Sequence, residues 1–152
     1  MIALAFHDAS KDTAASANGK AYDDLIQIVT RSSLVHVETA FIDGDLTRAN
    51  CFSAVPEPGC RFATIDLTAP QWLVVEVSWD PVKAMTAARS MDGLKYDMEA
   101  ILAWFIPGYP HDPNERFCSE SGVDIGKACG DARLLNAIAW HTSPAALHGL
   151  VA

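Results

Sequence analysis

The first half of the chain contains short apolar runs in which polar and apolar residues partly alternate, separated by polar links and by turns rich in Gly, Pro and Asp. Runs of this length, bounded by turn residues, are typical of strands. They predict an antiparallel meander of five or six strands, with a polar loop at residues 9–20. The predicted strands cover residues 2–6, 25–29, 34–42, 47–55, 61–67 and 72–77.

In the second half the apolar residues recur with the spacing of helices. Asp80 and Pro81 are the residue types expected at an N-cap and a first helical position, and Gly93 is expected to end that helix. Strands followed by helices indicate an α+β fold, in which the helices pack on one side of the antiparallel sheet. The predicted helices cover residues 81–91, 97–105 with Met98, Ile101, Leu102 and Phe105 on one stripe, a segment that begins at Cys118, 131–140, and a short last helix after Ser143-Pro144.

Composition and charge narrow the class of protein. The length fits one domain over residues 1–152, and 50% apolar with 20% charged residues is an ordinary globular composition. The net charge is −8 and no cluster of Lys or Arg occurs, which argues against nucleic-acid binding. Residues 1–8 lack the basic start of a signal peptide, and no apolar run is long enough to span a membrane. We therefore expect a cytoplasmic protein without an integral membrane segment.

The four cysteines form no C-x-x-C pair and no zinc-finger spacing, so the sequence indicates no metal site and no other cofactor. In a chain of this size without an export signal, cysteines are expected to be thiols. Cys51 and Cys60 could face each other across a hairpin, and the sequence leaves their pairing open.

Cys118 stands where a loop containing Pro110 and Pro113 is predicted to run into a helix. The unpaired N–H groups and the positive end of the helix dipole favour a thiolate at such a position. Glycines follow Cys118 at steps of four, at positions 122, 126 and 130, and therefore lie on its side of the helix. Each costs about 1 kcal/mol relative to alanine, so we expect close packing against a sheet in compensation. The alternative is a buried structural cysteine.

A nucleophilic cysteine requires a base, and histidine is the side chain with a suitable pKa. Of the five histidines, His36 is the one that lies inside an apolar strand, 34–42. Glu38 follows two residues later and points to the same side of the strand, where a carboxylate can orient the imidazole and stabilise its cation. The alternative is a solvated polar face of the sheet.

These segments resemble a known family. His36-Val37-Glu38 on an early strand, Gly93-Leu94-Lys95-Tyr96-Asp97 and Phe117-Cys118-Ser119-Glu120 are similar to motifs of the circularly permuted, NlpC-type papain-like cysteine hydrolases, the YiiX-like group. Asp23-Asp24-Leu25-Ile26 resembles the Gly-Asp-hydrophobic strand that precedes the histidine in that family. The resemblance covers about residues 22–125, and its specific part is the order, with the histidine strand before the cysteine helix. The chain departs from the family at Val35, where serine is common, and at Gly122, where a larger apolar residue is common.

The resemblance implies a permuted papain-like domain with Cys118 as the nucleophile and His36 as the general base. Glu38 matches the acidic residue after the histidine of the family. In related enzymes the orienting residue often comes from the next strand, where Asn50 is the candidate, with Arg48 on the same face.

Two further residues match family motifs. Tyr96 would line the substrate site near the reacting carbonyl, or else be a core tyrosine. Glu120 matches the family's Cys-x-Glu, and as a carboxylate in the first turn of a helix it would also interact with the helix N-terminus. Both are candidate substrate-binding residues, together with Asn50.

The resulting hypothesis is a thiol-dependent amidase or peptidase that cleaves an amide bond through a thioester on Cys118, without a metal. The family suggests cell-wall peptides as substrates, with other small peptides or acyl amides as close alternatives. Transfer of the acyl group to an acceptor other than water would use the same residues. A different class of function, a papain-like binding module or a phage or accessory structural module without turnover, fits the same strand and helix pattern. The sequence does not predict an oligomeric state.

Overall fold

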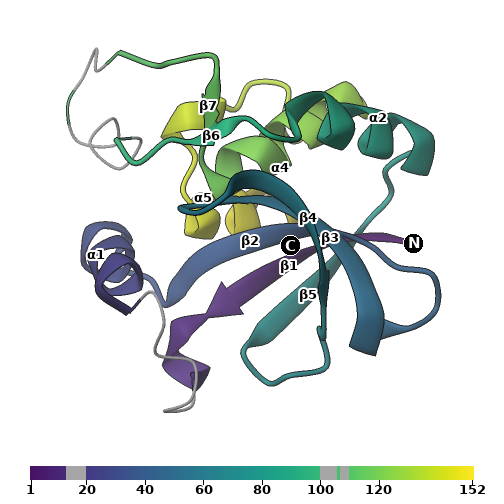
Figure 1. The fold of residues 1–152 in the computed structure, drawn as a ribbon, viewed down its shortest axis with the longest axis horizontal. Coiled ribbons are helices and arrows are strands. Elements are labelled where there is room, and N and C mark those ends of the chain that lie inside the picture. Colours follow the sequence, from purple (N-terminus) through teal and green to yellow (C-terminus); the bar gives the residue numbers. More distant parts are fainter. Residues whose placement is uncertain (13–19, 100–105, 107–109) are drawn as a thin grey trace.

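A five-stranded antiparallel sheet forms the centre of the protein, as expected for an α+β fold, and a two-stranded parallel sheet, β6–β7, accompanies it (Figure 1). The structure is a computed structural model and describes residues 1–12, 20–99, 106 and 110–152. In chain order, the described elements are β1 (Ile2–Asp8), η1 (Ala9–Lys11), α1 (Lys20–Thr30), β2 (Leu34–Phe41), η3 (Leu46–Arg48), β3 (Ala49–Val55), β4 (Gly59–Ile65), β5 (Trp72–Val77), α2 (Pro81–Met91), β6 (Lys95–Tyr96), β7 (Glu115–Arg116), α4 (Cys118–Ala128), η4 (Ala139–His141) and α5 (Pro144–Val151).

The strand order in the large sheet is β4-β3-β2-β1-β5, so it is not the simple meander that the sequence predicts. β2, β3 and β4 do pair in succession, but β5 pairs with β1 instead of β4. The residues of β1 explain this, because all of Ile2–Phe6 are at most 4% exposed. A strand that is apolar on both faces suits the interior of a sheet and not its edge.

The predicted strand at 25–29 is wrong, because these residues belong to helix α1. Ile26 is 1% exposed and Val29 packs against the same core, which is the spacing of a helix, whereas Ile28 is 75% exposed. A short run rich in Ile and Val does not distinguish a strand from a helix by its periodicity. The segment Asp23–Ile26, compared above with a strand of the hydrolase family, is therefore helical here.

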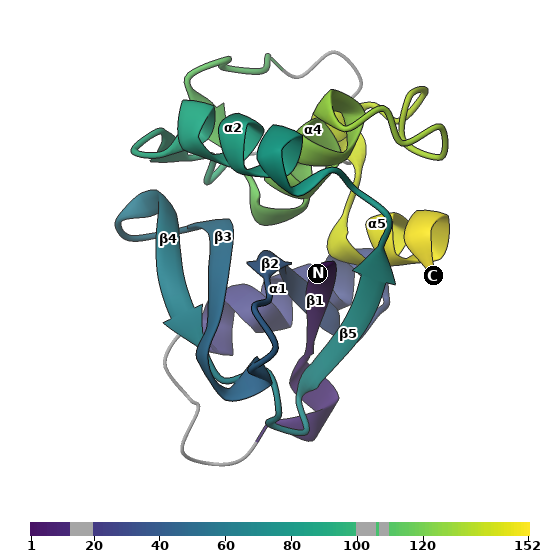
Figure 2. The same ribbon diagram turned by 90° about the vertical axis from the view of Figure 1, so that its right-hand side faces the viewer.

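The helices α4 and α5 cover one face of the sheet, and α2 packs on α4 (Figures 1 and 2). The ring of Phe6 in β1 contacts that of His148 in α5, with centroids 5.0 Å apart. The predicted start of α2 is confirmed, since the Asp80 side chain accepts hydrogen bonds from two backbone N–H groups of the first turn. Ser143 caps α5 in the same way, through the N–H of Ala146. α1 lies near the beginning of β2 (Figure 1).

The helix predicted at 131–140 is also wrong, because α4 ends in a glycine cap and the chain turns there. Gly130 has a φ of +79°. The N–H of Gly130 donates to the carbonyl of Lys127, and the N–H of Asp131 donates to the carbonyl of Gly126. These two hydrogen bonds are those of a Schellman motif. Within residues 131–140, a series of turns leads to the short η4, which begins at Ala139. The helix predicted at 97–105 lies outside the described residues from residue 100 onward.

Of the three glycines Gly122, Gly126 and Gly130, the first two are closely packed, but only Gly122 packs against the sheet. A Cβ at Gly122 would lie 3.1 Å from Leu147 of α5 and 3.7 Å from Leu4 of β1. The packing at Gly126 is closer still, because a Cβ added there would lie 2.6 Å from the Trp79 ring. These glycines therefore bring α4 against β1, α5 and Trp79, and not directly against His36, while Gly130 serves as the cap. No helix among the described ranges is long and apolar enough to cross a membrane.

We expect Gly126→Ala to lower the free energy of unfolding by about 1 to 3 kcal/mol, because the added methyl group overpacks the contact with Trp79. Urea titration followed by circular dichroism measures this change. Gly149→Ala is the matched control, since Gly149 lies in α5 with no atom within 4 Å of an added Cβ. Gain of helix propensity should stabilise that variant by up to about 1 kcal/mol. Equal effects of the two substitutions would contradict the packing role of Gly126.

Candidate active site

Cys118 is the first residue of α4, as predicted, with Phe117 as the N-cap in an extended conformation. The N–H of Phe117 donates to the Glu120 carboxylate at 3.2 Å, and Ser119 Oγ donates to the carbonyl of Thr142 at 2.5 Å. These bonds hold the first turn of the helix on both sides. Cys118 thus begins a helix whose first N–H groups have no acceptor within it.

His36 and Glu38 interact directly, as the alternation along β2 predicts. His36 Nε2 lies 2.8 Å from Glu38 Oε1, and the Glu38 side chain is only 1% exposed. The alternative of a solvated polar face is therefore wrong for Glu38. The His36 side chain keeps 20% of its surface exposed, so it lies at the boundary between the core and solvent.

The structure brings Cys118 to His36. Burial lowers the pKa of His36, but interactions with Cys118 and then with Glu38 outweigh burial and raise that pKa from 6.5 to about 10. The raised pKa favours the imidazolium form of His36, which interacts with both the sulfur of Cys118 and the carboxylate of Glu38. Cys118 itself is 1% exposed and belongs to the main hydrophobic core.

Arg61 of β4 is a member of this group that sequence reasoning missed. Its guanidinium binds Glu38 with two bonds, Nη1 to Oε2 at 2.8 Å and Nη2 to Oε1 at 2.6 Å. Burial raises the pKa of Glu38, but the bonds from Arg61 and His36 outweigh it, so the pKa lies below its ordinary value. In the sequence, Arg61 is only an arginine at the start of the predicted strand 61–67. Its contact with β2 follows from the register of the strands, which the sequence does not show.

Asn50 and Arg48 are not brought to His36. Asn50 is exposed and pairs with Phe41, which is at the other end of β2. Arg48 is exposed in η3, before β3 begins. Of the two candidates for orienting the imidazole, Glu38 is thus the one in contact with it.

Tyr96 and Glu120 are both buried beside the start of α4. The Tyr96 ring is 5.6 Å from that of Phe117, and its residue is 8% exposed, within the same core as Cys118. Glu120 lies 3.4 Å from His111 and 3.7 Å from Arg116. Burial, only partly offset by the Phe117 N–H and Arg116, raises the pKa of Glu120 to about 7. The hydrogen bond from the Phe117 N–H to Glu120 supports the alternative that this residue interacts with the helix N-terminus.

The other three cysteines differ from Cys118 in their surroundings. All four cysteines are free, and in the hairpin of β3 and β4 Cys51 pairs with Ala63 and Cys60 with Ala54, so the two thiols do not face each other. Burial raises the pKa of Cys51 to about 12 and that of Cys60 to about 11.

Comparison with known proteins adds no assignment. No model of a known protein family matches the chain, and no curated protein matches its sequence. The likeness to permuted papain-like hydrolases therefore stays a prediction that rests on the motifs quoted above.

Some side chains are grouped closely enough to hold a metal ion, although Cys118 and His36 are in neither group. In each group the potential ligand atoms lie within 4.8 Å of one another. The two groups are His7, Asp12 and Asp23, and Asp97, His111 and Glu120.

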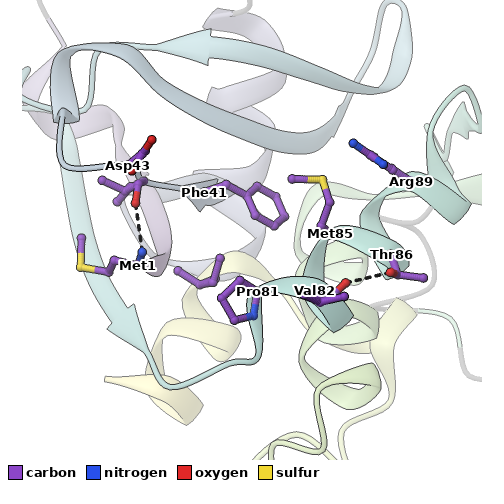
Figure 3. A pocket seen from close by; sticks show the side chains of 10 residues that line it. Met1, Phe41, Asp43, Pro81, Val82, Met85, Thr86 and Arg89 are labelled. Carbon is purple, nitrogen blue, oxygen red and sulfur yellow. Dashed lines mark hydrogen bonds between the residues drawn. The ribbon is translucent and has the colours of Figure 1, made fainter.

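A pocket of about 460 Å³ lies between α2 and the sheet (Figure 3). Phe41 and Met85 point toward each other across it, with Asp43 and Arg89 at its margins. Because Phe41 is at the opposite end of β2 from His36, this pocket is separate from the candidate active site. Its lining residues are Met1, Ile2, Phe41, Ile42, Asp43, Pro81, Val82, Met85, Thr86 and Arg89.

The raised pKa of Glu120 predicts a loss of stability as pH rises. Between about pH 4.5 and 7 the carboxyl of the unfolded chain has lost its proton while the folded one still holds it, so the free energy of unfolding falls. Glu120→Gln lacks this titration and should gain stability relative to the wild type, on the order of 3 kcal/mol by pH 8. Urea titrations at pH 4 to 8 measure the difference. Glu57→Gln, on the exposed turn before β4, is the control, and an equal pH trend in both variants would contradict the prediction.

Proposed function

We propose that this protein is a thiol-dependent hydrolase that cleaves an amide bond through a thioester on Cys118. The observation that supports it best is the interaction of His36 with Cys118, at the start of α4, and with the buried Glu38, which together raise the pKa of His36. A cation beside a cysteine at a helix N-terminus is the environment in which thiols act as nucleophiles. The permuted order of the motifs supports a papain-like core.

In the proposed acylation step Cys118 is a thiolate whose proton is held by His36; its sulfur attacks the substrate carbonyl carbon, and the carbonyl oxygen takes the negative charge. The backbone N–H of Cys118 has no acceptor within the helix and would stabilise this oxyanion. His36 gives its proton to the leaving nitrogen, the C–N bond breaks, and a thioester with a free amine results.

In the second step His36, now neutral, takes a proton from water, and the oxygen of that water attacks the thioester carbonyl. The C–S bond breaks, Cys118 is released, and the product is a carboxylate. Glu38 stays ionised throughout and stabilises the imidazolium each time it forms. Cell-wall peptides, other small peptides and acyl amides are the substrate classes we propose to test, with transfer to an amine or alcohol acceptor as a variant of the second step.

The second candidate is a non-catalytic module with a papain-like shell, which binds a partner or forms part of a larger assembly such as a phage particle. The observation in its favour is the burial of Cys118, which is 1% exposed and surrounded by the hydrophobic core. In this case the thiol contributes to packing and the charged side chains to specificity of the fold.

For the hydrolase, we expect Cys118→Ser to abolish turnover and His36→Ala to lower kcat/KM by a factor of about 10² to 10⁴, the usual contribution of a general acid–base group. Release of amines from cell-wall peptides and acylated amines, followed with an amine-reactive dye, measures the rate. Cys129→Ser is the control, because Cys129 lies at the other end of α4. Full activity in a folded Cys118→Ser protein would rule out the assignment.

Alkylation distinguishes the two candidates without a substrate. We expect iodoacetamide to modify Cys118 at pH 6 to 7, and this reaction to be lost in His36→Ala, because the neighbouring imidazolium favours the thiolate. Mass spectrometry of tryptic peptides gives the rate for each cysteine, and Cys129, which is partly exposed, provides the internal reference. A Cys118 that is inert until the protein unfolds would favour the non-catalytic module.

A further inference from the structure

We propose that Arg61 is a positioning residue of the candidate active site, acting on His36 through Glu38. The catalytic consequence of this inference rests on the proposed function. The effect of Arg61 on His36 does not, because it is a property of the folded protein. The site would then be a chain of four side chains, Arg61–Glu38–His36–Cys118, which crosses three strands and ends at a helix.

The geometry of the Arg61–Glu38 pair is the first support. Both Nη atoms of Arg61 donate to the carboxylate, one to each oxygen, at 2.8 and 2.6 Å. Glu38 Oε1 also lies 2.8 Å from His36 Nε2, so one oxygen is shared between the guanidinium and the imidazole. Paired donors of this kind fix the plane of a carboxylate, and with it the direction in which the imidazole is held.

The strands around the pair leave room for it. Ala5 is the cross-strand partner of Glu38 in β1 and carries only a methyl group. Ser53 of β3 is the partner of Arg61 and turns its hydroxyl to the carbonyl of Val37, at 2.6 Å. The long side chain of Arg61 can therefore extend from β4 past β3 to reach β2. A larger residue at either position would fill this space.

The charge around the pair shows why Arg61 matters. Glu38 is 1% exposed, and burial alone favours its neutral form. If an imidazolium is the only partner of a buried carboxylate, the carboxylate can take its proton. Both groups then become neutral. Arg61 remains charged at every accessible pH, so it keeps the carboxylate anionic and the proton on His36.

Other groups face His36 and Glu38 and are unchanged by substitution of Arg61. His36 is faced by Cys118 of α4, by its cross-strand neighbour His7, and by Asp23 of α1, whose own pKa is raised by burial despite its interaction with the two histidines. Cys51 of β3 interacts with both Glu38 and Arg61. A change in the pKa of His36 on removal of Arg61 therefore reports on the state of Glu38.

The experiment compares Arg61→Gln, Arg61→Lys, Glu38→Gln and the double variant Glu38→Gln/Arg61→Gln with the wild type. NMR of ¹³C-labelled histidine follows the titration of His36, and the pH profiles of kcat/KM and of Cys118 alkylation follow its effect. We expect Arg61→Gln to shift the midpoint of the His36 titration by at least one pH unit and to lower kcat about tenfold or more at unchanged KM. Arg61→Lys should recover part of both effects, because it restores the charge but not the paired bonds.

The double variant tests the route of action. If Arg61 acts through Glu38, Glu38→Gln/Arg61→Gln should be no worse than Glu38→Gln in kcat and in the His36 titration. Because that variant replaces both buried charges by neutral groups, it should fold even where Arg61→Gln alone does not. Arg133→Gln is the matched control, since Arg133 makes a similar paired contact with Asp131 at distances of 3.0 and 2.7 Å and is not part of the site.

Two results would overturn the inference. One is an Arg61→Gln protein that is less stable but keeps the wild-type His36 titration and alkylation profile, which would make Arg61 purely structural. The other is full additivity of the Arg61 and Glu38 effects. A Cys118→Ser protein with full activity would instead refute the proposed hydrolase, and the NMR titration would still decide the role of Arg61.

Discussion

The buried carboxylate of Glu38 is the constraint on which much of this structure depends. A charge that is 1% exposed is tolerated only when it is fully bonded, and here the bonds come from β2 itself and from β4. This requirement fixes the register of three neighbouring strands, because a shift of one residue in β4 would turn Arg61 to the other face of the sheet. The same interaction that permits the charge therefore also selects the pairing of the strands.

The position of α4 is set by a different kind of contact. Gly122 and Gly126 let the helix approach Leu4, Leu147 and Trp79 more closely than any side chain would allow. This packing determines the position of the first turn of α4 and therefore the position of Cys118. At the site, Glu38 lies between Arg61 and His36, and its interaction with His36 is one of the causes that raise the pKa of the imidazole beside Cys118.

Local signals in the sequence predicted the elements that have clear ends. Asp80-Pro81 and Gly93 delimit α2, and the loop before Cys118 gives the start of α4, because caps and turns act over a few residues. Residues 25–29 were misread since Ile and Val favour strands, while the contact of Ile26 with the core is tertiary. Residues 131–140 have helical composition, but Gly130 and the bond between Trp79 and Asp131 turn the chain away.

The candidate site divides in the same way. His36 and Glu38 are two residues apart on one strand, so alternation alone predicts their contact. Arg61 depends on the order of β2, β3 and β4 and on the small residues beside it, which no local pattern encodes. Asn50 was a reasonable candidate by strand spacing, but the observed register places it opposite Phe41, away from the imidazole.

The central place of β1 also bears on how the protein is made. Its apolar residues Ile2–Phe6 are synthesised before either partner strand is complete, since β2 ends at Phe41 and β5 ends at Val77. Until β5 has been synthesised, at least one edge of this buried strand has no neighbour. An open edge of this kind readily pairs with other chains. We expect nascent chains that end before Trp72 to associate with chaperones or aggregate, whereas chains that include β5 do not.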